Sequence, residues 1–367
     1  MILTIEQYAA QCFVMRKNTE TDLINVNAKE LVHDIRIMQD EVDNRMKFSL
    51  PVYYINSYNV DSCIISLNGN KDYYHIIDIA MFGYFHEFLS TLEFDMPNYA
   101  VFVYRRLRRD ICLSRYNNEE ALHYDPKEIF ANKHDIIDNG LPKRYTETKE
   151  EEFKCMIRFY FLHEYCHYFI KNPIRESSNE IVDMLVETFF ENIEGDNNPK
   201  FPNKEIQQMA VNKLRNDWRS NHDLREEIYC DFQAIMCLLE LPGISRRISA
   251  DMIFNSVMSF IYIQHIMWQA KHIDKRIEIL NQFNFRQNII VFFAWLMEED
   301  EYSDLVCKFL QKNNRFFIPT KLRVTPTLWE KQQNFYAWFT DILVADRVKD
   351  IKDGKYVFPV FIQPEYD

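Results

Sequence analysis

The sequence predicts an α+β fold that is predominantly helical, and three features of the 367-residue chain support this prediction. Long stretches place apolar residues at the three- and four-residue spacing of a helix, whereas β-type runs are short and gather between residues 51 and 104. The chain has only 6 glycines and lacks the glycine-rich patterns of phosphate-binding loops. Hydrophobic residues make up 47% and aromatic residues 15%, which indicates a packed core.

Residues 1–145 are expected to form N-terminal helices and a small β-sheet region. The β-type runs are rich in tyrosine and isoleucine, and Asn68-Gly69-Asn70 supplies a turn between two of them. The basic cluster Arg105 to Arg109 follows the last run, so we interpret it as a solvated or salt-bridged strand end. The expected helices are 4–16, 28–43 and 80–94, the expected strands are 51–56, 62–67, 73–79 and 99–104, and 117–146 is expected to be a loop region with a short helix.

Residues 146–245 are expected to carry the chemistry on helices, and residues 246–367 to form a helical C-terminal region. One helix should begin near Thr148, where Thr-Lys-Glu-Glu matches a capping box. It should end before Pro173, because proline disfavours the helical conformation in the residue before it. The other expected helices are 178–193, 204–218, one from Asp223 to Pro242, then 249–270, 275–282, 287–297, 303–312 and 327–349, with 356–362 as a strand or extended tail.

His163-Glu164-Tyr165-Cys166-His167 lies late in the helix that begins near Thr148 and matches the zinc-binding pattern His-Glu-x-x-His. Histidines four residues apart lie on one face of a helix, one turn apart, so both imidazoles can reach one metal ion. Glu164 points near the same ion, where it could take a proton from a zinc-bound water. The alternative is a core helix whose two histidines bond to carbonyl oxygens.

A catalytic zinc centre needs a third protein ligand and an open fourth position. Glu227 and Asp231 lie one turn apart on a later helix, so Glu227 could bind the metal while Asp231 holds the free N–H of a ligand histidine. Glu226 is rotated about 100° away on that helix, and we expect it to leave metal binding unchanged. Two alternatives stay open: a solvated acidic helix start, or another third ligand among Glu226, Glu187, Glu180 and His222.

His163-Glu164-Tyr165-Cys166-His167 and Glu227-Ile228-Tyr229-Cys230-Asp231 together resemble the gluzincin branch of zinc metallopeptidases. Those enzymes pair the first motif with a glutamate on a later helix, often as Glu-x-x-Ala-Asp, and Cys230 here replaces the alanine with another small residue. The resemblance covers about twelve positions over roughly eighty residues. It implies that His163, His167 and Glu227 bind zinc, that Glu164 is the general base and that Asp231 orients a ligand histidine.

The same resemblance implies a zincin-like fold, in which a small mixed β-sheet packs on the motif helix and its edge strand pairs with an extended substrate peptide. Which strand is the edge stays open in the sequence. The implied activity is zinc-dependent hydrolysis of peptide bonds in a protein or peptide. An oxyanion-stabilising donor should also be present. Tyrosine and histidine are the usual types, and the candidates are Tyr229, His222, Tyr262 and His265.

Two other functions remain as alternatives. One is a non-catalytic zincin-like protein that binds a peptide in the same cleft. The other is a regulatory protein, stress- or phage-responsive, that cleaves one target as a switch.

Charge and composition argue against several other classes of protein. The net charge of −12 disfavours a general nucleic-acid binder. Residues 252–270 lack Asp, Glu, Lys and Arg but carry several polar side chains, so we expect a buried helix and no membrane segment. The start of the sequence lacks a signal-peptide pattern, and the 8 cysteines are scattered, which together favour a reducing cytoplasm.

Overall fold

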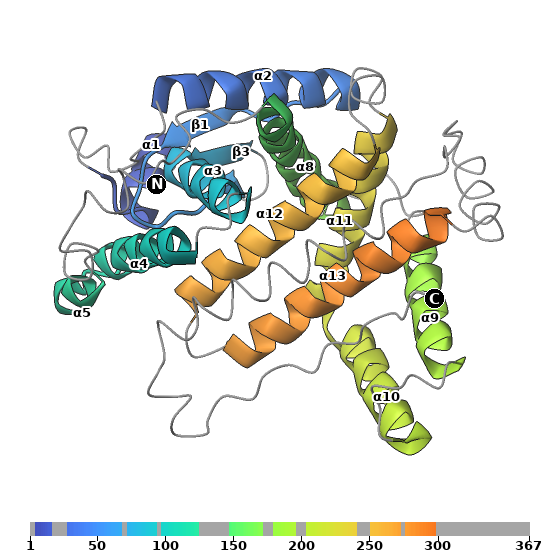
Figure 1. The fold of residues 1–367 in the computed structure, drawn as a ribbon. Helices are drawn as coiled ribbons and strands as arrows, with labels where there is room; N and C mark the ends of the chain where they lie inside the picture. The colour runs from blue at the N-terminus through green and yellow to red at the C-terminus, as the bar shows by residue number, and fades with distance from the viewer. Residues whose placement is uncertain are drawn as a thin grey trace.

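The computed structural model describes residues 4–16, 28–67, 72–93, 97–124, 147–171, 179–195, 203–240, 250–272 and 276–298. These residues form a predominantly helical α+β structure with one small mixed sheet, as the sequence predicts. In Figure 1 the sheet lies on the side of α1 (Ile5–Cys12) and α3 (Ile79–Glu93), away from α9 (Asn179–Gly195) and α10 (Lys204–Ser220). The expected helices 303–312 and 327–349 and the tail 356–362 lie outside the described residues, and the division into three regions stays a prediction.

The sheet has three strands in the order β1-β3-β2. The central strand β3 (Asp72–Asp78) pairs in parallel with β1 (Val52–Ile55) and antiparallel with β2 (Cys63–Leu67). These strands confirm the predicted runs 51–56, 62–67 and 73–79. On one face, Ile55 and Ile76 pack against Ala9 of α1 (Ile5–Cys12).

On the opposite face, the sheet packs against the helix that carries the His-Glu-x-x-His motif. His75 of β3 is fully buried, and its ring stacks on that of Tyr160 with 5.6 Å between centroids. The Tyr160 hydroxyl lies 2.9 Å from His75 Nε2. Strand β2 also contacts this helix directly.

The motif helix, α8 (Glu147–Lys171), is the centre of the fold. Most residues from Phe153 to Cys166 are apolar or aromatic and buried, so this part of the helix is covered on most sides. Its neighbours are α2 (Ala28–Met46), α11 (His222–Glu240) and α12 (Ala250–Lys271), as Figure 1 shows.

The predicted strand 99–104 is wrong, because these residues belong to helix α4 (Pro97–Ser114). The run contains tyrosine, valine and phenylalanine, which are typical of strands. Its buried positions nevertheless follow the spacing of a helix: Ala100, Val103, Tyr104, Leu107 and Ile111.

The arginine cluster Arg105 to Arg109 is therefore part of a helix and not a strand end. Arg106 forms a buried ion pair with Glu87 of α3 (Ile79–Glu93), and buried Arg108 donates a hydrogen bond to the carbonyl oxygen of Ala270. These two side chains tie α4 to α3 and to α12, so they stabilise the fold and do not form a basic surface.

Two further helices differ from the predicted ranges. Helix α1 ends at Cys12 because the chain then becomes extended, and Met15 forms an antiparallel bridge with Ser57. The two helices expected at 275–282 and 287–297 are one continuous helix, α13. The remaining elements are α5 (Asn118–His123), α9 (Asn179–Gly195), α10 (Lys204–Ser220) and α13 (Arg276–Glu298).

The apolar stretch 252–270 lies in α12, whose side chains are mostly buried against α8, α4 and α13. Across the described stretches of the chain, every helix is too short or too polar to cross a membrane. The apolar character of α12 is therefore accounted for by its place in the core.

Candidate metal centre

Helix α8 brings the two histidines of the motif to one point. His163 and His167 lie one turn apart, and their Nε2 atoms are 3.1 Å from each other. His163 is only 1% exposed because Phe159 and Phe260 pack against its ring. His167 lies nearer the surface, with 18% of its side chain exposed.

Helix α11 brings Glu227 to the same point. One carboxylate oxygen of Glu227 lies 3.4 Å from His163 Nε2, and the other lies 3.3 Å from His167 Nε2. Around a tetrahedral zinc ion with bonds of about 2.0–2.1 Å, neighbouring ligand atoms are about 3.3–3.4 Å apart. Among the described residues, one ligand atom each of His163, His167 and Glu227 lie within 4.8 Å of one another, so these residues could hold a metal ion.

The other ring nitrogens lie beside carboxylates, which favours both Nε2 atoms as ligands. His163 Nδ1 lies 3.0 Å from Asp231 Oδ1, and His167 Nδ1 lies 2.7 Å from Glu226 Oε1. A carboxylate only accepts, so the proton of each neutral ring belongs on Nδ1 and the lone pair on Nε2. Two lone pairs and one carboxylate that converge in this way are a donor set that fits zinc.

The contact between Glu226 and His167 is one that the sequence does not indicate, whereas the expectation that Glu226 leaves metal binding unchanged stays a prediction. The helical rotation of about 100° describes the direction of Cβ, but the glutamate side chain continues for three further bonds and reaches His167. His222, one turn earlier, lies 3.9 Å from the other oxygen of Glu226, on an exposed side chain. Of the other proposed third ligands, Glu187 is bound to Arg215 and Arg219, and Glu180 is exposed on α9.

Arg286 of α13 is a part of the site that the sequence does not indicate. Its Nε and Nη2 donate to the two oxygens of Asp231 at 2.7 and 2.8 Å, and its Nη1 lies 3.0 Å from Glu227 Oε2. The residue is 3% exposed, so it is a buried charge held between two carboxylates. No local pattern marks it, because its partners lie on another helix far away in the sequence.

The charges of this cluster oppose the effect of burial on its pKa values. Burial alone would raise the pKa of Glu227 and of Asp231, but Arg286 and the histidines hold both pKa values below their usual range. Burial alone would lower the pKa of His163, but Asp231 and Glu227 raise it. The carboxylates are therefore ionised and ready to bind or to orient a cation.

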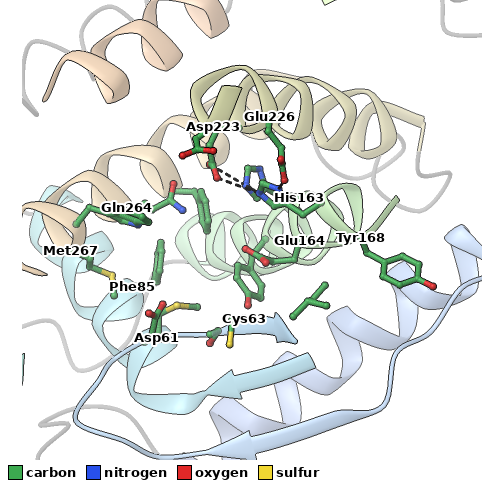
Figure 2. Close-up of a pocket in the computed structure, with 18 of the residues that line it drawn as sticks. Asp61, Cys63, Phe85, His163, Glu164, Tyr168, Asp223, Glu226, Gln264 and Met267 are labelled. Atoms are coloured by element: carbon green, nitrogen blue, oxygen red, sulfur yellow. Dashed lines mark hydrogen bonds and ion pairs between the residues drawn. The ribbon is translucent and has the colours of Figure 1, made fainter. Parts of the chain in front are cut away.

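A cavity of about 450 Å³ opens beside the cluster, and Glu164 forms part of its wall. Figure 2 shows Glu164 facing the cavity, below His163 in this view. Burial raises the pKa of Glu164, although the two histidines oppose this shift. Polar and apolar side chains both line the cavity, and the apolar ones include Met81, Phe85, Phe260, Met267 and Trp268.

None of the four expected oxyanion donors lines this cavity within the described residues. Tyr229 donates to Asp183 at 2.7 Å, and His222 is exposed at the start of α11. Tyr262 and His265 are buried in α12, where His265 stacks on Phe283 at 4.8 Å. Other polar side chains occupy the cavity wall, among them Tyr160, Gln264 and Lys271.

Comparison with known proteins adds no relative: no protein-family model, no curated protein and no solved structure matches the chain.

Proposed function

We propose that the chain is a zinc-dependent metallopeptidase of the gluzincin type, with a zincin-like arrangement of sheet and motif helix. The observation that carries this proposal is the convergence of the His163 and His167 Nε2 atoms, 3.1 Å apart, with the Glu227 carboxylate, whose two oxygens lie 3.4 Å from His163 Nε2 and 3.3 Å from His167 Nε2 respectively. Zinc bound by these three atoms supplies a Lewis acid that activates water and polarises a carbonyl group. The adjoining cavity offers space for the substrate.

Glu164 acts as the general base in this proposal. Its carboxylate lies in the cavity wall next to the histidine pair, and burial raises its pKa, which makes the carboxylate a stronger base. Glu164 takes the proton of the attacking water and then delivers it to the nitrogen of the departing amine.

Strand β2 is suited to hold the substrate backbone. It is an edge strand that pairs only with β3 among the described residues, and Cys63 and Ile64 of this strand line the cavity, as do Asp61 and Ser62 before it. An extended peptide can add to such an edge through main-chain hydrogen bonds. We propose that the substrate is a protein or peptide segment bound in this way across the cluster.

A comparison of the wild type with Glu164→Gln tests the proposed function. Glutamine keeps the size of the side chain but cannot act as a base, so Glu164→Gln should keep one zinc per chain while hydrolysis falls by about 10²–10⁴-fold. Each zinc-loaded protein is incubated with an extract of cells that express it, and new protein N-termini are identified by mass spectrometry.

Each outcome of this comparison has a clear meaning. New N-termini in the wild-type reaction alone would support a peptidase. Zinc with no new N-termini in either reaction would favour the peptide-binding alternative. A wild type without zinc, or a Glu164→Gln variant that no longer binds zinc, would contradict the proposed roles.

A further inference from the structure

Gln264 of α12 has its amide group fixed by Arg286. Arg286 Nη1 donates to Gln264 Oε1 at 3.0 Å. A guanidinium group has donors only, so the amide oxygen must face Arg286 and the NH₂ end must point the other way. The chemistry of the partner therefore settles the orientation of this amide.

The same nitrogen links Gln264 to the candidate metal ligands. Arg286 Nη1 lies 3.0 Å from Gln264 Oε1 and 3.0 Å from Glu227 Oε2, so these two oxygens are at most 6.0 Å apart. Glu227 Oε2 in turn lies 3.4 Å from His163 Nε2. Gln264 also lines the cavity that Glu164 lines, and Figure 2 shows its side chain on the α12 side of the cavity, directed toward the histidine cluster.

The support behind Gln264 is rigid. Arg286 is buried, and Asp231 accepts two hydrogen bonds from it at 2.7 and 2.8 Å. Asp231 also contacts His163 Nδ1, so one chain of contacts runs from a metal ligand to the Gln264 amide. A donor held in this way needs no reorganisation when charge develops next to it, which is the condition for strong electrostatic stabilisation.

Other polar groups of the cavity wall are engaged elsewhere. The Tyr160 hydroxyl lies 2.9 Å from His75 Nε2, toward the sheet. Lys271 pairs with Asp61 at 3.2 Å. Gln264 thus combines a position near the ligands with a donor aimed away from Arg286, its hydrogen-bond partner in the described part of the chain.

We propose that Gln264 is a catalytic residue that stabilises the oxyanion, an inference that rests on the proposed peptidase function. The oxygen of water forms a bond to the peptide carbonyl carbon, the π-electron pair of the carbonyl moves to its oxygen, and the proton of the water passes to Glu164. Gln264 Nε2–H donates a hydrogen bond to the oxygen that has become negative, and it transfers no proton.

The test uses acetohydroxamate, which binds zinc through oxygen and carries negative charge on oxygen. Its affinity for the zinc-loaded full chain is measured by calorimetry, beside that of ethanethiol, whose sulfur is a weak acceptor. Gln264→Leu removes the amide. Gln264→Glu keeps the shape of the side chain and an oxygen that accepts from Arg286, but an ionised glutamate offers no N–H. Zinc content and circular dichroism are measured for each protein.

We expect both variants to keep one zinc per chain and to bind acetohydroxamate about 10- to 100-fold more weakly, because each loses one hydrogen bond to a charged oxygen. The affinity of Gln264→Leu for ethanethiol should match that of the wild type. Gln208→Leu is the matched control, since Gln208 is an exposed amide on α10 that bonds Glu194 and does not line the cavity.

Several results would overturn the inference. Unchanged acetohydroxamate affinity in a folded, zinc-loaded Gln264→Glu protein would exclude the proposed donor. An equal loss for acetohydroxamate and ethanethiol in Gln264→Leu would show that Gln264 only shapes the cavity. A wild type that binds no zinc would overturn the peptidase proposal and this inference with it, whereas the first two results leave the peptidase proposal intact.

Discussion

Glu226 and Asp231 each hold the Nδ1 side of one motif histidine, at 2.7 and 3.0 Å. Both come from α11, which also supplies Glu227, so a single helix presents the carboxylate proposed as a metal ligand and two carboxylates beside the histidine rings. A neighbouring carboxylate fixes the ring orientation of a ligand histidine and raises its basicity. At the scale of single residues, the geometry of the site depends on these two pairs.

The structure predicts an order of zinc affinity among three variants of α11. Glu227→Ala removes a proposed ligand and should lose zinc almost completely, because three protein ligands are usual in catalytic zinc centres. Asp231→Ala and Glu226→Ala should each weaken zinc binding by about 10–100-fold, since each releases one histidine ring. Competition with a chelator measures the order, and wild-type affinity in Glu226→Ala would show that its contact with His167 has no effect.

His163, Glu164, His167 and Glu227 could be chosen from the sequence because each motif lies within two turns of one helix. Helical periodicity alone decides which of these side chains share a face. Their roles as ligands and base stay predictions. Glu226 could not be chosen in this way, because its contact depends on how far a long side chain reaches toward a neighbouring helix.

Helix α13 contributes Arg286, which contacts two carboxylates of the site. This guanidinium lies between Asp231 and Glu227 with 3% of its side chain exposed. Removing one partner of a buried ion pair leaves an uncompensated charge, which is more costly than losing the attraction between the two.

Arg286→Met should therefore lower the free energy of unfolding by about 3–5 kcal/mol. Urea denaturation measures the change, with zinc removed from all samples so that metal binding does not contribute. Arg219→Met is the control, because Arg219 pairs with Glu187 at the surface with 63% of its side chain exposed and should cost no more than about 1 kcal/mol. If the two substitutions changed the free energy of unfolding equally, the ion pairs of Arg286 would not stabilise the fold.

Helix α4 shows why a short apolar run is ambiguous at the scale of elements. The run 99–104 has the composition of a strand, and a window of six residues fits either period. Only the longer pattern from Ala100 to Ile111, together with packing against α3 and α12, makes the helix. The three real strands were predicted well because turn residues separate them.

At the scale of the whole molecule, two buried histidines make the free energy of unfolding depend on pH. His75 of β3 and His265 of α12 are fully buried, and burial lowers the pKa of each to about 3. In the unfolded chain a histidine has a pKa of about 6.5. Below that pH the unfolded chain binds protons that the folded protein excludes, so stability is present above pH 6.5 and is lost as the pH falls.

Each of these two histidines should cost about 1.4 kcal/mol of stability at pH 5.5 relative to pH 7.5. Burial raises the pKa of Asp78 to about 6, so the folded protein gains a proton in the same range and offsets part of this loss. The prediction is that His75→Gln reduces the difference between the unfolding free energies at the two pH values by about 1.4 kcal/mol.

Urea denaturation at pH 7.5 and pH 5.5 measures this difference for the wild type, for His75→Gln and for His33→Gln. His33 is exposed on α2, so its variant should keep the wild-type pH dependence. Glutamine at position 75 can still bond the Tyr160 hydroxyl, which limits other effects of the substitution. A His75→Gln protein with the wild-type pH dependence would contradict the prediction.

By itself, the sequence determined the predominantly helical α+β class, three strands, the motif helix and the residues proposed as ligands and base. All of these follow from periodicity, turn residues and spacing within one element, which are local properties of the chain. The tertiary structure alone decided that Glu226 reaches His167, that Arg286 joins Asp231 to Glu227, and that the Gln264 amide faces the cavity. These contacts join different helices. They depend on how side chains pack in the core, which the residue pattern of a single helix does not determine.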